Sequence, residues 1–550
     1  MMGTAQDGAI VFDLLAAGVL TLVIGAVALI LLQRAIKRNM MVTGVFQRPA
    51  EPERPRRASI ATLSLAVDEG AAVPGIADSI LRRIMLAHVA AGAVYGNLAT
   101  IILFRFSDIE FLPLRTFVVF WAYAWPTTMV LHLLLGPDRR AKALIHLFYF
   151  AVLILLGIGN WLLGSETMVL GGLPLPAVFQ PLLLWVLYAL PSLFLLLFLN
   201  RTIRTIGPLV LVFVFILMVG GHIAVQLLSL PSVAYVAVTV AIAIGLGGLA
   251  AFWGTALLGV LVAAWPAWLA VAFLRDRYAA KRMSEFQLTV NAIWMLQALM
   301  LSLSLFREHS VLAMSAALVP LIAWRLTLTL ALRPTVKAAR ERPPQTLLLL
   351  RVYGFGRRSR RLFDLLGARW RLLGSIDLIA APDLASRTVE PATFLDFIRG
   401  RLVRLFVRTP DNLRERLDAI DRKPDPDARF RVNQLFCSDD MWKEAVIALM
   451  GAATLVVMDL RGFSMRRAGC VFEVQTLLDT VPLSRLVFLF DRSTDRSALD
   501  TILAERWREL DSASPNLAAA APSVRLLDAG AGDIKAVKRL LAIAQAPLSH

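Results

Sequence analysis

The pattern of hydrophobic and polar positions changes near residue 335. Before that point the chain consists of long uncharged apolar runs, and after it charged residues recur every few positions. A run of about 20 apolar residues is what an α-helix needs to cross the hydrocarbon core of a bilayer. The pattern therefore predicts an all-α polytopic transmembrane domain over residues 1–335, with a cytoplasmic loop at 34–84, a basic linker at 336–345, and a soluble domain over 346–550.

Ten apolar runs are candidate spans. Their approximate bounds are 9–33, 85–104, 113–135, 143–164, 178–199, 207–229, 232–250, 252–274, 286–306 and 311–333. Basic residues follow the first run rather than precede it, which is typical of a signal anchor and not of a cleaved signal peptide.

The basic loops between these runs indicate how the chain is oriented, because lysine and arginine concentrate on the cytoplasmic side. Three of the four pairs of neighbouring basic loops are separated by an even number of runs, but three runs lie between "NRTIR" and "RDRYAAKR". We therefore expect a re-entrant or broken segment between residues 232 and 274, interrupted at the glycine-rich "GLGGLAAFWG". This predicts nine crossings, with the amino terminus outside and the carboxyl domain in the cytoplasm; ten crossings are the alternative.

Few polar side chains fall within the predicted spans, and no acidic residue is placed to pair with Arg325. We interpret them as interhelical hydrogen bonds and helix ends rather than as a transport pathway. They are Asp13, His132, His146, Asn160, His222, Gln226, Asn291 and Arg325.

The carboxyl-terminal part alternates continuous apolar strands with amphipathic helical stretches, which predicts a mostly parallel, doubly wound α/β sheet covered on both faces. The predicted strands are 347–354, 375–381, 429–436, 454–460, 485–491 and 523–529. Ligands bind at the carboxyl ends of such strands, so the loops after Gly354, Asp459 and Asp491 are where we expect chemistry.

The first of these loops is "YGFGRRSRR". Gly354 and Gly356 come between a strand and a helix, where free amide groups and the helix dipole can receive a phosphate, and Arg357 and Arg358 add positive charge. Because Ser359 occupies the place of a third glycine, a plain turn with a solvated basic face remains the alternative.

The helix in "RGFSMRRAGCVFEVQTLLD" raises the question of what Glu473 does. At helical spacing it falls on the margin of an apolar stripe, so we expect it to be half-buried at best. It is either a structural residue at the rim, pairing with Arg466 or Arg467, or the working acid of a cleft. Cys470, one turn earlier, is a small core residue rather than a nucleophile, because the domain has no histidine before His550; the same absence argues against a zinc site.

Residues 437–474 resemble the middle of a Toll/interleukin-1 receptor (TIR) domain and of the related nucleoside deoxyribosyltransferases. The resemblance is carried by Asp439 or Asp440, the helix with Trp442, the strand "TLVVMDL" with Asp459, Ser464, and "GCVFE", in which Gly469 stands where the family has tryptophan. It implies a flavodoxin-like fold. It also implies that Glu473 stands beside the ribose of NAD or a nucleoside and assists cleavage of the N-glycosidic bond.

Hydropathy and net charge restrict the class of protein and the kind of partner. A mean hydropathy of +0.67 fits a membrane protein, and much of the net charge of +17 lies in loops beside apolar runs, so we expect a lipid bilayer and no nucleic acid as partner. We expect a membrane-anchored signalling or defence protein of a bacterial inner membrane whose TIR-like domain binds, and in the enzymatic case cleaves, NAD or a related nucleotide after homo-oligomers form. A non-catalytic sensor or self-association platform is the alternative, and a transporter with a regulatory domain is a third.

Overall fold

The structure of the protein is a computed structural model that describes several separate stretches of the chain. These are residues 19–20, 23–36, 38–39, 55–57, 62–67, 75–107, 110–136, 138–162, 168–170, 173–189, 201–228, 230–308, 313, 315–351, 356–379, 391–438, 440–519, 521–530 and 532–545.

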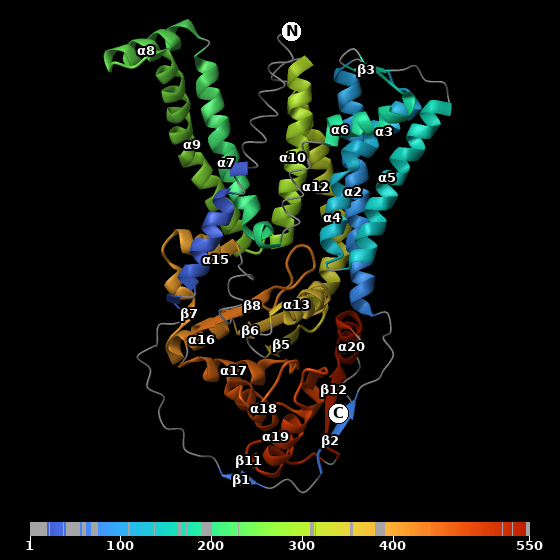
Figure 1. Cartoon of the computed structure of the whole chain (residues 1–550), viewed down its shortest axis with the longest axis vertical. Coiled ribbons are helices and arrows are strands. Elements are labelled where there is room, and N and C mark those ends of the chain that lie inside the picture. Colours follow the sequence, from blue (N-terminus) through green and yellow to red (C-terminus); the bar gives the residue numbers. More distant parts are fainter. Residues whose placement is uncertain are drawn as a thin grey trace.

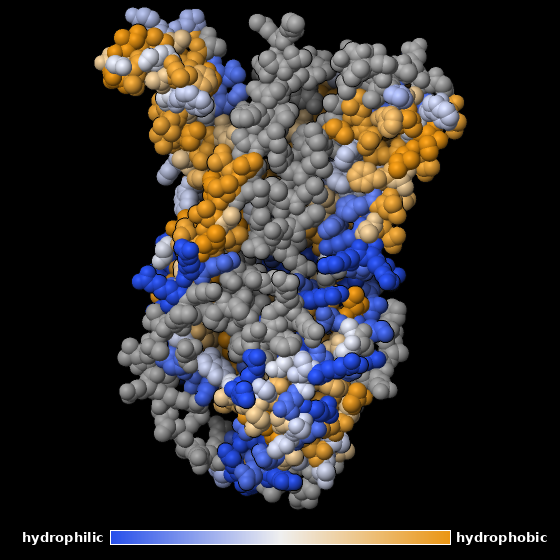
Figure 2. Space-filling model, in the orientation of Figure 1, coloured by the Kyte–Doolittle hydropathy of each residue, from blue (hydrophilic) through white to orange (hydrophobic). Residues whose placement is uncertain are grey.

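Long helices form one end of the molecule and a parallel sheet forms the other (Figure 1). Among the described residues, six helices are long and apolar enough to cross a membrane, which suggests a multi-pass membrane protein. They are Ile76–Phe106 (α2), Pro113–Leu134 (α3, Pro113–Ala124, and α4, Pro126–Leu134), Arg139–Leu162 (α5), Ile206–Leu227 (within α7, Arg201–Leu227), Gly248–Ala279 (α9) and Ser315–Glu341 (containing α12, Leu318–Glu341). Their outer faces are hydrophobic, and hydrophilic residues gather where they meet the sheet domain (Figure 2).

The predicted break lies between α8 (Pro231–Ala243) and α9, at residues 244–247. Gly245 has φ +74, a left-handed conformation that glycine adopts without strain. At about 1.5 Å per residue, the 13 residues of α8 span roughly 20 Å, which is shorter than a bilayer core. The helix is therefore interrupted between 232 and 274, at the start of the predicted glycine-rich stretch, and whether this segment is re-entrant and how many times the chain crosses stay predictions.

The other predicted runs are described in part. The run at 286–306 lies within α10 (Glu285–Glu308), the run at 178–199 is described up to α6 (Gln180–Ala189), and the run at 9–33 contributes the helix Val23–Ile36. Helices α7 and α9 pack most tightly at two glycines: a Cβ on Gly220 would lie 2.7 Å from the carbonyl oxygen of Gly259. Small residues are what allow such close approach between membrane helices.

The sheet has eight parallel strands in the order β2-β12-β10-β9-β5-β6-β8-β7. All six predicted strands are present, and their bounds are β5 (Gln345–Arg351), β6 (Gly374–Ile379), β8 (Val432–Cys437), β9 (Leu455–Asp459), β10 (Leu486–Phe490) and β12 (Ser523–Asp528). Two edge strands were not predicted. Strand β2 (Ser64–Val67) comes from the segment expected to be only a loop, and it extends the sheet beside β12.

The second unpredicted edge strand, β7 (Phe406–Val407), corrects a helix prediction. The amphipathic pattern of residues 392–407 predicts one helix, but the segment divides into α15 (Pro391–Ile398), a 3₁₀ turn and β7. Gly400 ends the helical part with φ +69. The backbone of Phe406 and Val407 then pairs with β8, and both side chains are buried. A second short pairing joins β1 (Arg56–Arg57) to β11 (Leu510–Asp511). After Thr409, the short helix α16 (Pro410–Asp418) leads toward β8.

Helices cover both faces of the sheet, as the continuous apolar strands predict. Along β5, Leu347 and Leu349 belong to the core that contains α13 (Gly356–Trp370) and α20 (Asp533–Gln545). The alternate residues Leu348 and Leu350 belong to the core with α17 (Trp442–Ala452), α18 (Ala468–Thr480) and α19 (Arg496–Arg508). The side-chain period of two along a strand thus divides each strand between two cores.

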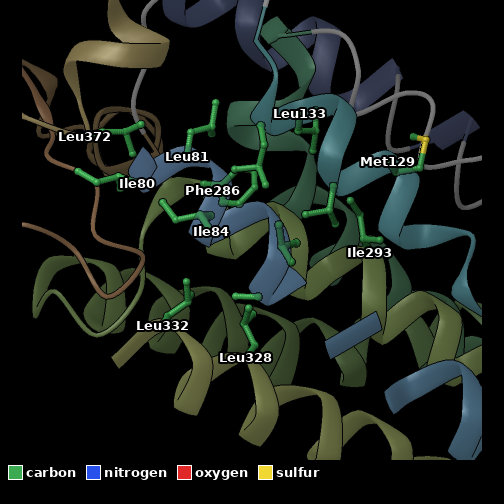
Figure 3. Packing of buried hydrophobic residues seen from close by; sticks show 14 of the residues in the cluster. Ile80, Leu81, Ile84, Met129, Leu133, Phe286, Ile293, Leu328, Leu332 and Leu372 are labelled. Atoms are coloured by element: carbon green, nitrogen blue, oxygen red, sulfur yellow. The ribbon is translucent and has the colours of Figure 1, made fainter. Parts of the chain in front are cut away.

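One of these cores continues into the membrane helices. Leu372, which follows α13, lies near Ile80 and Leu81 of α2 (Figure 3), and the same cluster includes Phe286 of α10. The sheet therefore does not have a core of its own on that face.

A polar network at the same level joins the turn between α9 and α10 to the segment before β8. The Arg431 guanidinium pairs with Asp425 at 3.0 Å, donates to the carbonyl of Tyr278 at 2.8 Å and stacks over its ring at 4.1 Å. The Ser284 hydroxyl donates to the carboxylate of Asp427 at 2.6 Å. Because both aspartates are about 1% exposed, these contacts replace water that the carboxylates have lost.

Candidate functional site

The carboxyl ends of β5 and β9 meet at the centre of the sheet, where the chain changes direction. From β5 the chain proceeds outward through β6, and after β8 it returns to β9 on the other side of β5. Such a switch point is where open α/β sheets bind ligands. Arg351, the last residue of β5, is paired in register with Asp459, the last residue of β9. The order β10-β9-β5 places the first, fourth and fifth of the predicted strands side by side.

A buried ionic network fixes the end of β9. Both Asp459 carboxylate oxygens accept from Arg461, at 2.7 and 2.8 Å, and the same guanidinium donates to Asp533 at 2.7 Å. Asp459 and Arg461 are each 2% exposed, and the hydrogen bonds to the two carboxylates raise the pKa of Arg461 despite its burial. The network ties β9 to the start of α20 and gives Asp459 a structural role; the predicted ligand contact of Asp459 stays a prediction.

Glu473 lies in the second turn of α18 and is only 1% exposed, so the expectation that it is half-buried was wrong. Helix α18 packs against the sheet with Cys470, Val474 and Leu477, as its apolar stripe predicts. Helices α17 and α19 also contact α18, and the packed domain leaves the margin on which Glu473 stands almost without contact with solvent. The sequence period places a residue on a helix face, but it does not show how many neighbours cover that face.

The carboxyl group of Glu473 is incompletely paired. Its Oε2 atom has no hydrogen-bond partner among the described residues, and no ion pair joins it to Arg466 or Arg467 in that part of the chain. Burial raises the pKa of Glu473 to about 8, and the positive charge of Arg351 opposes the shift without cancelling it. The group is thus mostly protonated at neutral pH, and it can ionise when a cation approaches it.

The loop after β8 and the start of α17 bring further polar and aromatic groups to the same edge of the sheet. Both carboxylate oxygens of Asp440 are buried without a partner among the described residues, whereas Asp439 lies outside them. The Trp442 ring of α17 lies beside Gly469, because a Cβ there would be 3.7 Å from it, and it meets Phe472 edge to face at 5.5 Å. A tryptophan ring from the neighbouring helix therefore stands beside the position where the TIR pattern has its own tryptophan.

The remaining predicted ligand residues are described only in part. Gly354 lies outside the described residues; Gly356 begins α13, and the side chains of Arg357 and Arg358 are not described. Ser464 is half-buried in the loop between β9 and α18, where its carbonyl accepts from the amide of Arg467 at 3.0 Å. Phosphate or nucleotide contact by these residues stays a prediction.

Sequence reasoning missed Arg351 and Arg461. Each is a charged residue at the end of a continuous apolar strand, in "LLLLR" and "VVMDLR", and a cation buried at such a position needs a partner. That signal was available in the sequence, and Asp459 stands only two residues before Arg461, but the second partner of Arg461, Asp533, comes from the distant helix α20. Comparison of the chain with protein-family models, with curated proteins and with solved structures found no match.

Proposed function

We propose that the sheet domain binds NAD or a related nucleotide and that Glu473 assists cleavage of its N-glycosidic bond. The observation that carries this proposal is a buried carboxyl group, one loop beyond the carboxyl end of β9, with an oxygen that has no partner among the residues that the structure describes. Burying such a group costs stability, and strongly perturbed carboxyl groups concentrate at functional sites.

The raised pKa fits this chemistry. The nicotinamide ring of NAD carries a positive charge while it is bonded to ribose, so its approach favours the ionised form of Glu473. The carboxylate then faces the positive charge that develops on the ribose as the carbon–nitrogen bond breaks and nicotinamide leaves with the bonding electron pair. Water completes the reaction by adding hydroxide to the ribose and releasing a proton. Because free Glu473 is mostly protonated, kcat/KM would rise with pH toward about 8.

The topology supports kinship with TIR domains. Within the eight strands, β6, β5, β9, β10 and β12 stand in the order 2-1-3-4-5 when numbered along the chain, which is the flavodoxin-like order. Glu473 stands in the helix after the third of these strands, as the resemblance requires. By this proposal the chain is a membrane-anchored signalling or defence protein, with its sheet domain in the cytoplasm and with homo-oligomers as its active form.

A non-catalytic platform is the second candidate. The core shared by α2, α13 and α20, together with the network around Arg431, links the sheet domain rigidly to the membrane helices. Such a linkage suits a domain that passes on the state of the membrane part, with or without catalysis.

Incubation of the purified chain with NAD at high protein concentration separates the two candidates. The full-length chain is needed, because β2 and the core with α2 would be lost from an isolated carboxyl domain. Release of nicotinamide and ADP-ribose is measured for the parent, for Glu473→Gln, and for Glu505→Gln, which changes an exposed glutamate on α19. Turnover that is lost only in Glu473→Gln supports the enzyme, and absence of turnover in clustered parent protein favours the platform.

A further inference from the structure

A groove of about 480 Å³ runs along the last turns of α12, where this helix reaches the sheet domain. Four cationic side chains and one carboxylate line it, together with apolar residues of α12, Gln287 of α10 and Pro426 of the segment before β8. The charged residues are Arg325, Arg333, Lys337, Arg340 and Glu341. The groove is at the boundary where the apolar helices end.

The two sides of the groove have different chemistry. Thr329, Arg333 and Lys337 recur every four residues and form a polar ridge. Leu328, Leu332 and Val336 form a neighbouring apolar ridge, in which Leu328 and Leu332 are buried in the core at 2% and 3% exposure and Val336 is partly exposed. At about 1.5 Å per residue, the apolar ridge extends for roughly 12 Å along the helix. An occupant that satisfies both ridges must combine an anionic group with a hydrocarbon chain.

The cations are not neutralised within the described chain. Only Lys337 has an acidic partner, Glu341 at 3.9 Å, and both side chains are exposed. Arg325 donates to the neutral Asn291 side chain at 3.3 Å, and Arg333 and Arg340 have no ion pair among the described residues. The groove thus keeps an excess of positive charge at the level of lipid headgroups, where basic pockets between helices bind anionic lipids.

We propose that this groove binds an anionic phospholipid, with the phosphate of the headgroup between Arg333, Lys337 and Arg340 and the start of an acyl chain against Val336. A free phosphate shares the anionic chemistry, but it leaves the apolar ridge unused. The volume accommodates a headgroup and the first part of the chains, with the remainder in the bilayer. Pro426 stands between Asp425 and Asp427, which belong to the polar network around Arg431. The lipid would therefore contact the segment that links the sheet domain to the membrane helices.

The test uses the full-length chain in phosphatidylcholine nanodiscs with and without phosphatidylglycerol, followed by native mass spectrometry of the lipid that stays bound. The double variant Arg333→Gln/Arg340→Gln is compared with Arg139→Gln/Arg140→Gln, which removes the same charge from exposed positions at the start of α5. At about 1 kcal/mol for each basic residue near the surface, we expect roughly 30-fold weaker retention of phosphatidylglycerol in the groove variant only.

A second variant, Thr329→Trp, fills the groove without changing its charge, and it should also lose the bound lipid. Equal losses in the groove and α5 variants, or full retention in the groove variants, would overturn the proposal. Inorganic phosphate provides the remaining arm: if it displaces the lipid or binds as tightly in its absence, the ligand is a free anion and the lipid assignment is wrong. Thermal unfolding confirms that each variant is folded.

Discussion

Replacing Glu473 with glutamine tests whether the buried carboxyl group is protonated in the folded protein. The ordinary pKa of 4.5 applies to the unfolded chain, and burial raises the pKa to about 8 in the folded one. Between these values the folded state holds a proton that the unfolded state has released, so stability is present in full below pH 4.5 and falls as pH rises through about 8. Glutamine keeps the shape of the side chain and removes this dependence.

The size of this effect follows from how steeply the free energy of unfolding changes with pH. Each pH unit between the two pKa values costs about 1.4 kcal/mol, so the folded parent loses roughly 4 kcal/mol between pH 5 and pH 8 through this group. For a domain of this size that corresponds to a Tm difference of roughly 8–16 °C between the two pH values. The parent and Glu473→Gln should therefore have similar Tm values at pH 5, and the variant should be markedly more stable at pH 8.

The assay is thermal unfolding of the full-length chain, followed by tryptophan fluorescence across this pH range. Asp425, whose pKa burial raises to about 6, titrates in the parent and in the variant, so its contribution cancels in the difference. Glu505→Gln, at an exposed position, should follow the parent at every pH. If the Tm difference between the parent and Glu473→Gln does not change with pH, the carboxyl group is not protonated in the fold and the argument from burial fails.

Four further outcomes are expected. If Glu473 is catalytic, kcat/KM for NAD rises with pH, is half-maximal near pH 8 and levels above it, as measured from nicotinamide release. Arg461→Met leaves the buried Asp459 without its cation and leaves Asp533 with only the exposed Arg361 at 3.7 Å, so it should cost about 3–5 kcal/mol of stability, seen as a lower Tm. Arg431→Met breaks the contacts with Asp425 and with the turn after α9, and it should increase proteolytic cleavage between the two parts of the chain. Leu65→Asp places a charge in the partly buried strand β2, and it should lower hydrogen-exchange protection in β12.

Matched changes at exposed positions provide the controls. Arg414→Met, on the exposed surface of α16, should leave both Tm and cleavage unchanged. Val67→Asp changes an exposed residue of β2 and should disturb β12 less than Leu65→Asp does. An Arg461→Met variant as stable as the parent would show that the buried network contributes nothing net. A flat pH profile of kcat/KM would separate Glu473 from the rate-determining chemistry.

The sequence by itself determined the elements whose burial depends on local periodicity. Runs long enough to cross a bilayer marked the helical part, and continuous apolar segments such as "LLLL" at 347–350 marked six of the eight parallel strands. The break near Gly245 was also predictable, because glycine-rich sequence disfavours a continuous helix. These features follow from the nearest residues in the chain and from the solvent that they require.

Only the tertiary structure decided which distant groups meet. Ser64–Val67 is too short to predict as a strand from its own sequence, and it becomes one because it pairs with the edge of β12, more than 450 residues away. The burial of Glu473 likewise depends on elements distant in the sequence that pack around α18, and its electrostatic neighbour Arg351 comes from strand β5. The loss of water around a side chain depends on the whole packed structure. The local sequence pattern therefore placed Glu473 on a helix, whereas the fold set its pKa and with it its charge.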